Sequence, residues 1–240
     1  VAVGHNALTS NTTGSGNTAI GRDVLYNNTT GKNNTASGVD ALYSNTTGEY
    51  NTASGHSALF NNTTGNENTA SGYAALFNNT TGVNNTASGD QALYNNIDGG
   101  DNTASGNYAL YNNTTGQNNV ASGYAALYTN TTGSGNTALG RAADVGSGNL
   151  SNATAIGFEA SVSASNKIRL GNSSVNVIEG EVAFSNSSDR RLKKDIVGTR
   201  YGLNTILKLR PVDYQMKSNN LEQIGFIAQE LRPIVPEAVS

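Results

Sequence analysis

Residues 102–116 read N-T-A-S-G-N-Y-A-L-Y-N-N-T-T-G, and this stretch recurs with a period of 17 residues along most of the chain. Its first glycine recurs ten times from Gly4 to Gly157, and its second glycine eight times from Gly14 to Gly133. A fixed period is the sequence signature of a repeat architecture in which each repeat contacts its neighbours. The sequence therefore predicts a solenoid of ten coils.

The residues of the repeat favour strands and turns over helices. Paired Thr, paired Asn and two Gly per period are poor helix formers, and N-T-T-G is typical of a turn. Seventeen residues are also too few for a helix pair, a leucine-rich repeat or a propeller blade. We therefore expect two short strands and two turns per coil. The coils would stack as a parallel β-solenoid that rises about 4.8 Å per coil and on the order of 45 Å in total.

Four columns of repeated residues run down the predicted stack. Alanine recurs every 17 residues from position 2 to 155, and leucine from position 8 to 127. Small Ala and slim Leu suit a thin core. Asparagine forms the other two columns, from position 11 to 130 and from position 17 to 136. We expect stacked Asn amides to hydrogen-bond along the axis, as in cross-β ladders.

A column of aromatic residues directly follows the leucine column. Neighbours on a strand point to opposite faces, so the rings point outward if Leu fills the interior. Seven stacked rings exceed the few hundred Å² of apolar patch that monomers tolerate. We predict that a neighbouring subunit covers them, with a glycan-stacking face as the alternative. This aromatic stripe comprises Tyr26, Tyr43, Phe60, Phe77, Tyr94, Tyr111 and Tyr128.

The N-T-A-(I/S/L)-G-x-x-A-L pattern of residues 1–160 resembles the YadA-like head repeat of trimeric autotransporter adhesins and of many phage tail fibres. The resemblance implies a left-handed parallel β-roll with three chains side by side around one axis, and therefore a homotrimer. The usual head repeat is shorter than 17 residues, so the N-N-T-T-G turn looks like an added loop.

The composition changes after residue 160, where 11 of the 14 Lys and Arg and all three Pro are found. Residues 161–187 carry short period-two bursts of aliphatic residues, which predict strands of a β neck. Residues 203–209 place apolar residues on one helical face, and Pro211 ends that run. A strand from Val212 and a short helix after Gly225 should follow. The 53 residues from 188 to 240 are marginal for an independent core, so this domain is either truncated or dependent on a partner.

One segment, S-D-R-R-L-K-K-D-I at 188–196, carries residues that could do chemistry. A serine can attack a backbone carbonyl if an unprotonated lysine accepts its proton, and nearby cations favour the neutral lysine. Residues five apart fall on different helix faces, so Ser188 and Lys193 could meet only across a turn. The alternative is a solvated basic stretch in which Ser188 or Asp189 caps a helix.

Three blocks in this region resemble the endosialidase-type intramolecular chaperone domain. They are S-D-x-R-L-K-x-x-I, L-x-x-I-x-x-L-x-P-V-x-Y and G-F-I-A-Q-E-L-x-x-x-x-P-E, in that order. The resemblance implies a domain that folds as a trimer, helps the upstream β-structure to assemble and then cuts itself off with a Ser/Lys dyad. Carried over by position, Ser188 is the nucleophile, Lys193 is the general base and the scissile bond joins Ser187 to Ser188.

The sequence is compatible with three functions. A phage or prophage tail fibre in the virion is favoured, because the S-D-R-R-L-K block stands where an autotransporter adhesin should continue as coiled-coil stalk and membrane anchor. A bacterial surface adhesin head is the alternative. A minor alternative is ice binding by the Thr ladder of the N-T-T-G turns.

If the fibre attaches to a host, the contacts should lie where the coils differ. The residue after each first glycine differs in chemistry from coil to coil, which predicts a solvent-facing column. Its partner would be a host-surface glycan or protein. The candidate receptor-facing residues are His5, Arg22, His56, Tyr73, Asp90, Tyr124 and Arg141.

Composition argues against several other functions. The formal net charge of −3 offers no reason to expect nucleic acid, and the absence of Cys excludes thiolate sites. His5 and His56 lie three coils apart, about 14 Å along the axis, which is too far for one metal ion. No apolar run approaches the roughly 20 residues of a membrane helix. We therefore expect no metal, no cofactor and no membrane insertion. Because the chain starts inside a repeat, we expect its natural N-terminus to lie upstream.

Overall fold

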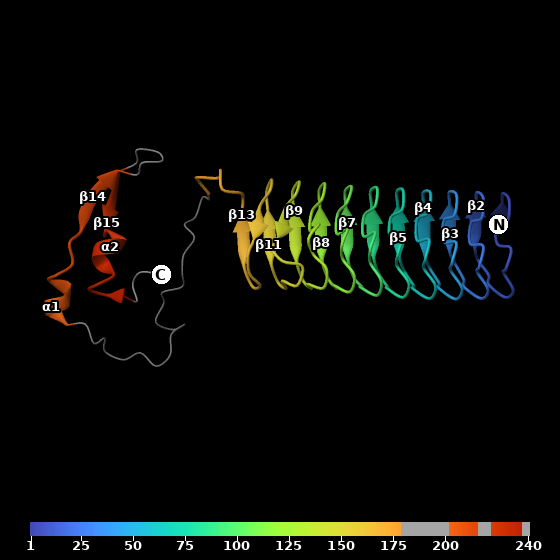
Figure 1. The fold of residues 1–240 in the computed structure, drawn as a ribbon, viewed down its shortest axis with the longest axis horizontal. Coiled ribbons are helices and arrows are strands. Elements are labelled where there is room, and N and C mark those ends of the chain that lie inside the picture. The colour runs from blue at the N-terminus through green and yellow to red at the C-terminus, as the bar shows by residue number, and fades with distance from the viewer. Residues whose placement is uncertain (179–201, 216–221, 237–240) are drawn as a thin grey trace. The chain divides into compact units, whose positions relative to one another are not determined.

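The computed structural model describes residues 1–178, 202–215 and 222–236. The chain divides into two compact units, Val1–Val175 and Asn176–Ser240. In the first unit, the chain winds into a solenoid in which each coil adds one short strand to a single long sheet (Figure 1).

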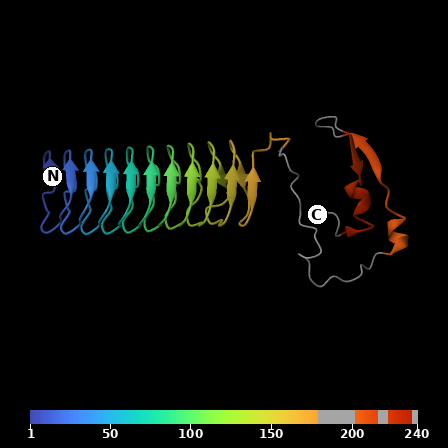
Figure 2. The same ribbon diagram turned by 180° about the vertical axis from the view of Figure 1, so that it is seen from behind.

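Eleven strands form this sheet, and neighbouring strands pair in parallel. The register advances by 17 residues per coil, from Ala2 opposite Ala19 to Ala138 opposite Ala155. The strands keep the same orientation along the whole solenoid (Figure 2). A parallel β-solenoid of 17-residue coils is therefore confirmed. Its strands are β1 (Ala2–Val3), β2 (Thr18–Ile20), β3 (Thr35–Ser37), β4 (Thr52–Ser54), β5 (Thr69–Ser71), β6 (Thr86–Ser88), β7 (Thr103–Ser105), β8 (Val120–Ser122), β9 (Thr137–Leu139), β11 (Thr154–Ile156) and β13 (Ile168–Leu170).

The other side of the coil differs from the expectation of two strands per coil. Strands form there only in the last coils, where β10 (Asp144–Val145) pairs with β12 (Ser161–Val162), and the earlier coils have turns. The cause is local, since residues such as Asp40 and Leu42 have φ values of 58° and 51°. Extended strands require negative φ, so two left-handed residues per coil prevent a strand. The expectation was wrong for these coils.

The core is as thin as the columns predict. The central alanine of each strand from β2 to β9 is buried, and so are the leucines from Leu25 to Leu127. A third buried column, Val24 and the alanines that follow it at 17-residue spacing, precedes the leucines. Ala2 is exposed and Leu8 half-buried, and both lie in the first coil that the structure describes.

The solenoid also takes in the start of the segment that the sequence assigns to a neck. Strand β12 pairs with β10, and β13 pairs with β11. This last step is shorter, with Ala155 opposite Arg169. Residues 179–187 of the expected neck lie outside the described residues.

The second unit contains four short elements in its described part. Helix α1 (Leu203–Ile206) precedes an antiparallel pair of β14 (Val212–Gln215) and β15 (Glu222–Gly225), and helix α2 (Ala228–Leu231) follows. The expected helix, the strand from Val212 and the helix after Gly225 are confirmed, whereas β15 was not expected. Among the residues that the structure describes, neither helix has a buried member.

Candidate functional site

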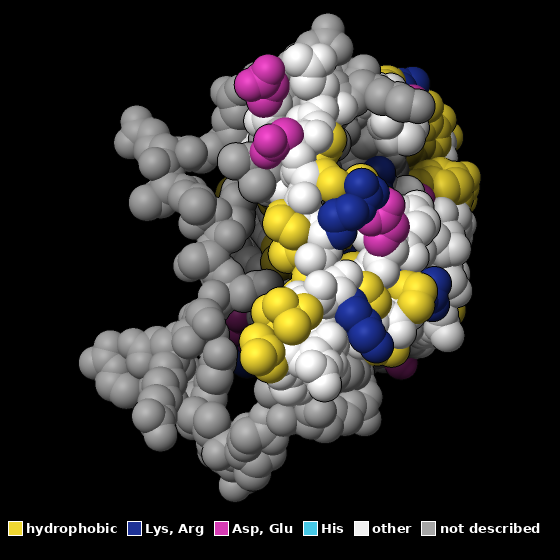
Figure 3. All heavy atoms as spheres, turned by 90° about the vertical axis from the view of Figure 1, so that its left-hand side faces the viewer, with side chains coloured by type: hydrophobic (Ala, Val, Ile, Leu, Met, Phe, Trp, Pro, Cys, Tyr) yellow, Lys and Arg dark blue, Asp and Glu magenta, His cyan; other side chains and the backbone are white. Residues whose placement is uncertain are grey.

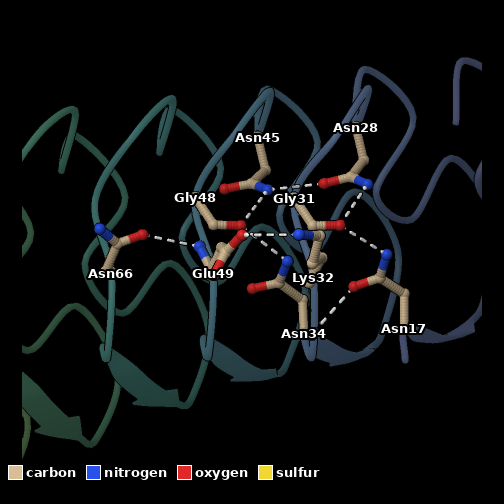
Figure 4. A network of polar contacts seen from close by, with 9 residues as sticks. All are labelled: Asn17, Asn28, Gly31, Lys32, Asn34, Asn45, Gly48, Glu49 and Asn66. Carbon is tan, nitrogen blue, oxygen red and sulfur yellow. Dashed lines mark hydrogen bonds and ion pairs between the residues drawn. The ribbon is translucent and has the colours of Figure 1, made fainter. Parts of the chain in front are cut away.

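Two buried asparagine ladders hold the coils together on one side of the solenoid (Figure 4). The amide of Asn45 donates to Asn28 Oδ1 at 2.8 Å and to the Gly48 carbonyl at 3.0 Å. The amide of Asn34, from the other ladder, donates to the same Gly48 carbonyl at 2.8 Å. The expected axial hydrogen bonds are therefore present, and they saturate buried polar groups that would otherwise destabilise the core. These ladders are structural.

The aromatic stripe is a continuous stack of rings. Successive ring centroids lie 5.1 to 5.4 Å apart, with interplanar angles of 4° to 11°. The rings lie outside the buried leucines, as expected, and all except Tyr128 are half-buried. Each inner ring has both faces covered by its neighbours. Only ring edges are free along the stripe, so it cannot stack sugar rings except at its ends.

The column that follows the first glycine is largely open to solvent. Six of the seven candidate receptor-facing residues are exposed, and Asp90 is half-buried. Some of them contact one another or a neighbour. His56 stacks on Tyr73 at 5.4 Å, and Arg22 lies 3.4 Å from Asp23. The column therefore offers mixed chemistry without a shared centre along most of its length.

Near the C-terminal end of this column, aromatic and cationic side chains do gather. The Arg141 guanidinium lies 5.7 Å from the Tyr124 ring centroid and 5.3 Å from that of Phe158. It also donates to Glu159 Oε1 at 3.1 Å. The structure thus brings together Tyr124 and Arg141 from the predicted set.

Beside Tyr124 lies a hollow of about 420 Å³, lined by Tyr108, Tyr124, Ala125 and Tyr128, which we call the tyrosine hollow. The Tyr108 ring stands nearly perpendicular to that of Tyr124, at 5.9 Å and 86°. It also meets Tyr111 edge-on, at 5.7 Å and 66°. Sequence reasoning did not single out Tyr108. The available signal was that Tyr108 is the single aromatic residue in a column that otherwise holds Asp, Ser, Ala, Gln, Glu or Asn.

A second hollow runs along the other side of the stripe. It is a groove of about 710 Å³ lined by Ser44, by threonines and Ile97, and by Asn61, Asn78, Asn95 and Asn112. The threonine hydroxyls donate to carbonyls one coil away, as Thr63 does to Thr80 O at 3.0 Å. Because these hydroxyl protons are used within the fold, the ladder of first threonines is a poor ice-binding array. The second threonine of each turn stays exposed.

The outward face of the long sheet carries no charge. On strands β2 to β9 and β11, the residues that flank the buried alanine are Thr or Val on one side and Ser, Ile or Leu on the other. Serines occupy the middle strands, and the aliphatic residues Ile20, Leu139 and Ile156 lie toward the ends with 38 to 47% of their surface exposed. We call this surface the sheet face.

The described part of the second unit exposes apolar side chains (Figure 3). Leu203, Ile206, Leu207 and Phe226 are between 46 and 72% exposed. One ion pair ties α2 to the segment before β14, with two Arg210 nitrogens 2.6 and 3.1 Å from the Glu230 carboxylate oxygens. Hydrogen bonding to Arg210 lowers the pKa of the Glu230 carboxyl below its usual value.

The predicted catalytic residues Ser188 and Lys193 and the scissile Ser187–Ser188 bond lie outside the described residues. Among the described residues, no group of three or more His, Cys, Asp or Glu could hold a metal ion. The described helices are all too short to cross a membrane.

Comparison with known proteins assigns a family to most of the second unit. Residues 188–240 match the Peptidase S74 family, described as the chaperone of endosialidase. No curated protein matches the chain, and no solved structure matches it either. The C-terminal domain is therefore an endosialidase chaperone domain that follows a β-solenoid.

Proposed function

We propose that this β-solenoid, followed by an endosialidase chaperone domain, is a trimeric tail fibre of a phage or prophage that attaches to the host surface. The solenoid would be a left-handed YadA-like β-roll, and the domain from residue 188 would direct trimer assembly and then cleave itself off before Ser188. The observation that carries this proposal is the order of the two units, with the chaperone match directly after the repeats.

The repeats explain why assembly needs a chaperone. If one chain slips by a whole coil against another, every column still meets its equivalent, so wrong registers cost little free energy. Parallel pairing is also slow and prone to misassembly. A C-terminal trimer that forms first would fix the number of chains and their register.

The exposed apolar residues of the second unit support such a trimer. Leu203, Ile206 and Leu207 lie on and just after α1, and all three are exposed in the described part of the chain. Apolar surface of this kind stabilises a fold when a partner covers it. Two further copies of this domain are the partner that we propose.

For the solenoid, the sheet face is the contact between chains that we favour. It is uncharged, its Thr and Ser side chains allow close approach, and Ile20, Leu139 and Ile156 expose aliphatic surface on it. The prediction that the aromatic stripe forms the contact between chains remains open to test. It ranks second because its rings already cover one another.

The proposed cleavage is an acyl shift followed by hydrolysis. Lys193 accepts the proton of Ser188 Oγ, which attacks the Ser187 carbonyl carbon. The Ser187–Ser188 C–N bond breaks as the nitrogen takes up a proton, which leaves an ester. Water then hydrolyses the ester to a Ser187 carboxylate and restores the hydroxyl of Ser188, now N-terminal. Proximity favours the reaction because the nucleophile adjoins its own target carbonyl.

Intact mass under denaturing conditions tests this proposal. The wild-type chain should give a fragment that ends at Ser187, while Ser188→Ala and Lys193→Ala stay whole. Ser187→Ala and Lys194→Arg, which keeps the positive charge beside Lys193, are the matched controls and should cleave. If the wild type stays whole, or Ser188→Ala is cut, the autoprotease assignment fails and the domain acts only in assembly.

The adhesin and ice-binding alternatives predict different results. If the protein is an adhesin head, its full-length sequence should continue into a coiled-coil stalk and a membrane anchor. Ice binding predicts thermal hysteresis. A tail fibre should have no stalk-and-anchor continuation and should show no thermal hysteresis.

A further inference from the structure

We propose that the tyrosine hollow binds a neutral saccharide ring and is the place where this chain first holds a host glycan. This inference rests on the host attachment proposed above and assigns it to one site. The site comprises Tyr108, Tyr124 and Tyr128, in the coils that contain Gly106 and Gly123.

The lining of the hollow suits a sugar. Its three phenols each combine an apolar ring with a hydroxyl that donates and accepts hydrogen bonds, and no charged residue lines it. A pyranose has the matching pattern, an apolar C–H face rimmed by hydroxyls. The volume of about 420 Å³ lies within the range of small-ligand sites and is large enough for one ring and part of a second.

The walls of the hollow are held in place before any ligand arrives. Arg141 lies over Tyr124 and is itself fixed by its hydrogen bond to Glu159. Tyr108 packs edge-on against Tyr111 and Tyr124. Tyr128 ends the aromatic stack on Tyr111, so its ring is supported from one side. Rigid aromatic side chains lose little conformational entropy on binding, which favours recognition.

The backbone conformation does not favour a tyrosine at position 108. The backbone there has a φ of 59°, in the left-handed region that disfavours bulky side chains and tolerates Asn or Asp best. Equivalent positions in other coils hold smaller or polar residues, among them Asp23, Asp40 and Ala125. Tyr108 is therefore a departure from the repeat, and it is this departure that gives the hollow one of its walls.

A second copy of the chain is a less suitable occupant. Contacts between parallel copies would repeat in every coil, as the columns do. The hollow is instead confined to the coils where Tyr108 interrupts the repeat beside Tyr124. An acidic or basic peptide would need charged partners, which the lining lacks.

Saturation-transfer NMR tests the proposal on the full chain with a panel of methyl pyranosides, namely the α and β forms of glucose, galactose, mannose and N-acetylglucosamine. At least one should receive magnetisation on its C–H protons. Tyr108→Asn should weaken its binding at least tenfold, and Tyr108→Phe should weaken it less, because the ring remains.

Tyr50→Asn is the matched control. Tyr50 is an exposed tyrosine with a φ of 57°, so this change relieves the same backbone strain outside the hollow. It should leave binding unchanged. Both Asn variants should keep the wild-type urea midpoint or raise it, which excludes unfolding as the cause of lost binding. The proposal is overturned if no pyranoside binds, or if Tyr108→Asn binds as tightly as Tyr50→Asn does.

The results distinguish failure of the saccharide-site proposal from failure of the tail-fibre proposal. If the chain forms trimers and cleaves before Ser188 but binds no pyranoside, the hollow proposal fails and the fibre stands. If a pyranoside binds in the hollow while the chain stays monomeric and whole, the fibre proposal fails and the saccharide site stands.

Discussion

At the scale of the residue, asparagine does in this solenoid what larger apolar side chains do in ordinary cores. The cross-section is too thin for a broad hydrophobic core, so amide ladders fill part of it. The Asn79 amide, for example, donates to Asn62 Oδ1 at 2.8 Å and to the Gly82 carbonyl at 3.0 Å. The hydrogen bonds of each asparagine amide are complete only if the adjacent coil is present. The stability of every coil is therefore linked to that of its neighbours.

Asp144 shows what happens where the leucine column ends, because it stands 17 residues after Leu127. Its carboxylate accepts from Thr129 Oγ1 at 2.7 Å and from the Thr129 backbone N–H at 3.1 Å. Burial nevertheless raises the pKa of Asp144 above its usual value, against the opposing effect of these hydrogen bonds. The folded state then binds this proton more tightly than the unfolded state does.

The contribution of Asp144 to stability should therefore fall as pH rises from its usual pKa through the raised one. Urea unfolding of the wild type and of Asp144→Asn across this range should show the wild type losing stability relative to the variant. The carboxyl carbon of Asp144 should titrate above 3.8 in NMR. A wild-type advantage that grows with pH would mean that the Thr129 hydrogen bonds outweigh burial.

At the scale of the element, each strand of the long sheet is short because a glycine ends it. Gly89 directly follows β6 with a φ of 138°, and a Cβ there would meet backbone atoms of Gly106 in the next coil. Backbone of adjacent coils therefore comes into close contact at this column, and only glycine fits.

Gly89→Ala should destabilise the solenoid by at least about 3 kcal/mol, because left-handed strain and a backbone collision add together. Gly135→Ala is the control. Its φ of 68° is also left-handed, but the nearest atom to the added Cβ is Asn152 N at 3.9 Å, so only the strain remains. Its cost should be about 1–2 kcal/mol in urea unfolding. Equal costs for the two variants would rule out the close approach of coils as the cause.

At the scale of the whole molecule, the question is which surface joins the chains. Ile20 on the sheet face and Ile97 in the groove are equally exposed, at 47 and 46%. Light scattering should show a trimer for the wild type. Ile20→Asp should weaken it, because a buried unpaired carboxylate costs about 3–5 kcal/mol. Ile97→Asp should leave the trimer intact. If Ile97→Asp dissociates the chains and Ile20→Asp does not, the sheet face is not the contact.

The sequence alone was sufficient to predict the period, the parallel stacking, the buried Ala and Leu columns, the Asn ladders and the chaperone domain. These follow from repetition, since one coil predicts all the others and the same column must meet itself. The motif at residues 188–240 could be recognised because its three blocks are specific.

Only the tertiary structure decided how each coil is closed and where its surface becomes a site. Left-handed residues such as Leu42 replace the expected second strand, and propensity could not predict this because burial and axial hydrogen bonds outweigh the local strain. The tyrosine hollow likewise depends on Tyr108, Tyr124 and Tyr128 meeting across two coils. Contacts between residues 16 or more positions apart are set by the winding of the chain, so they became visible only once the coils were stacked.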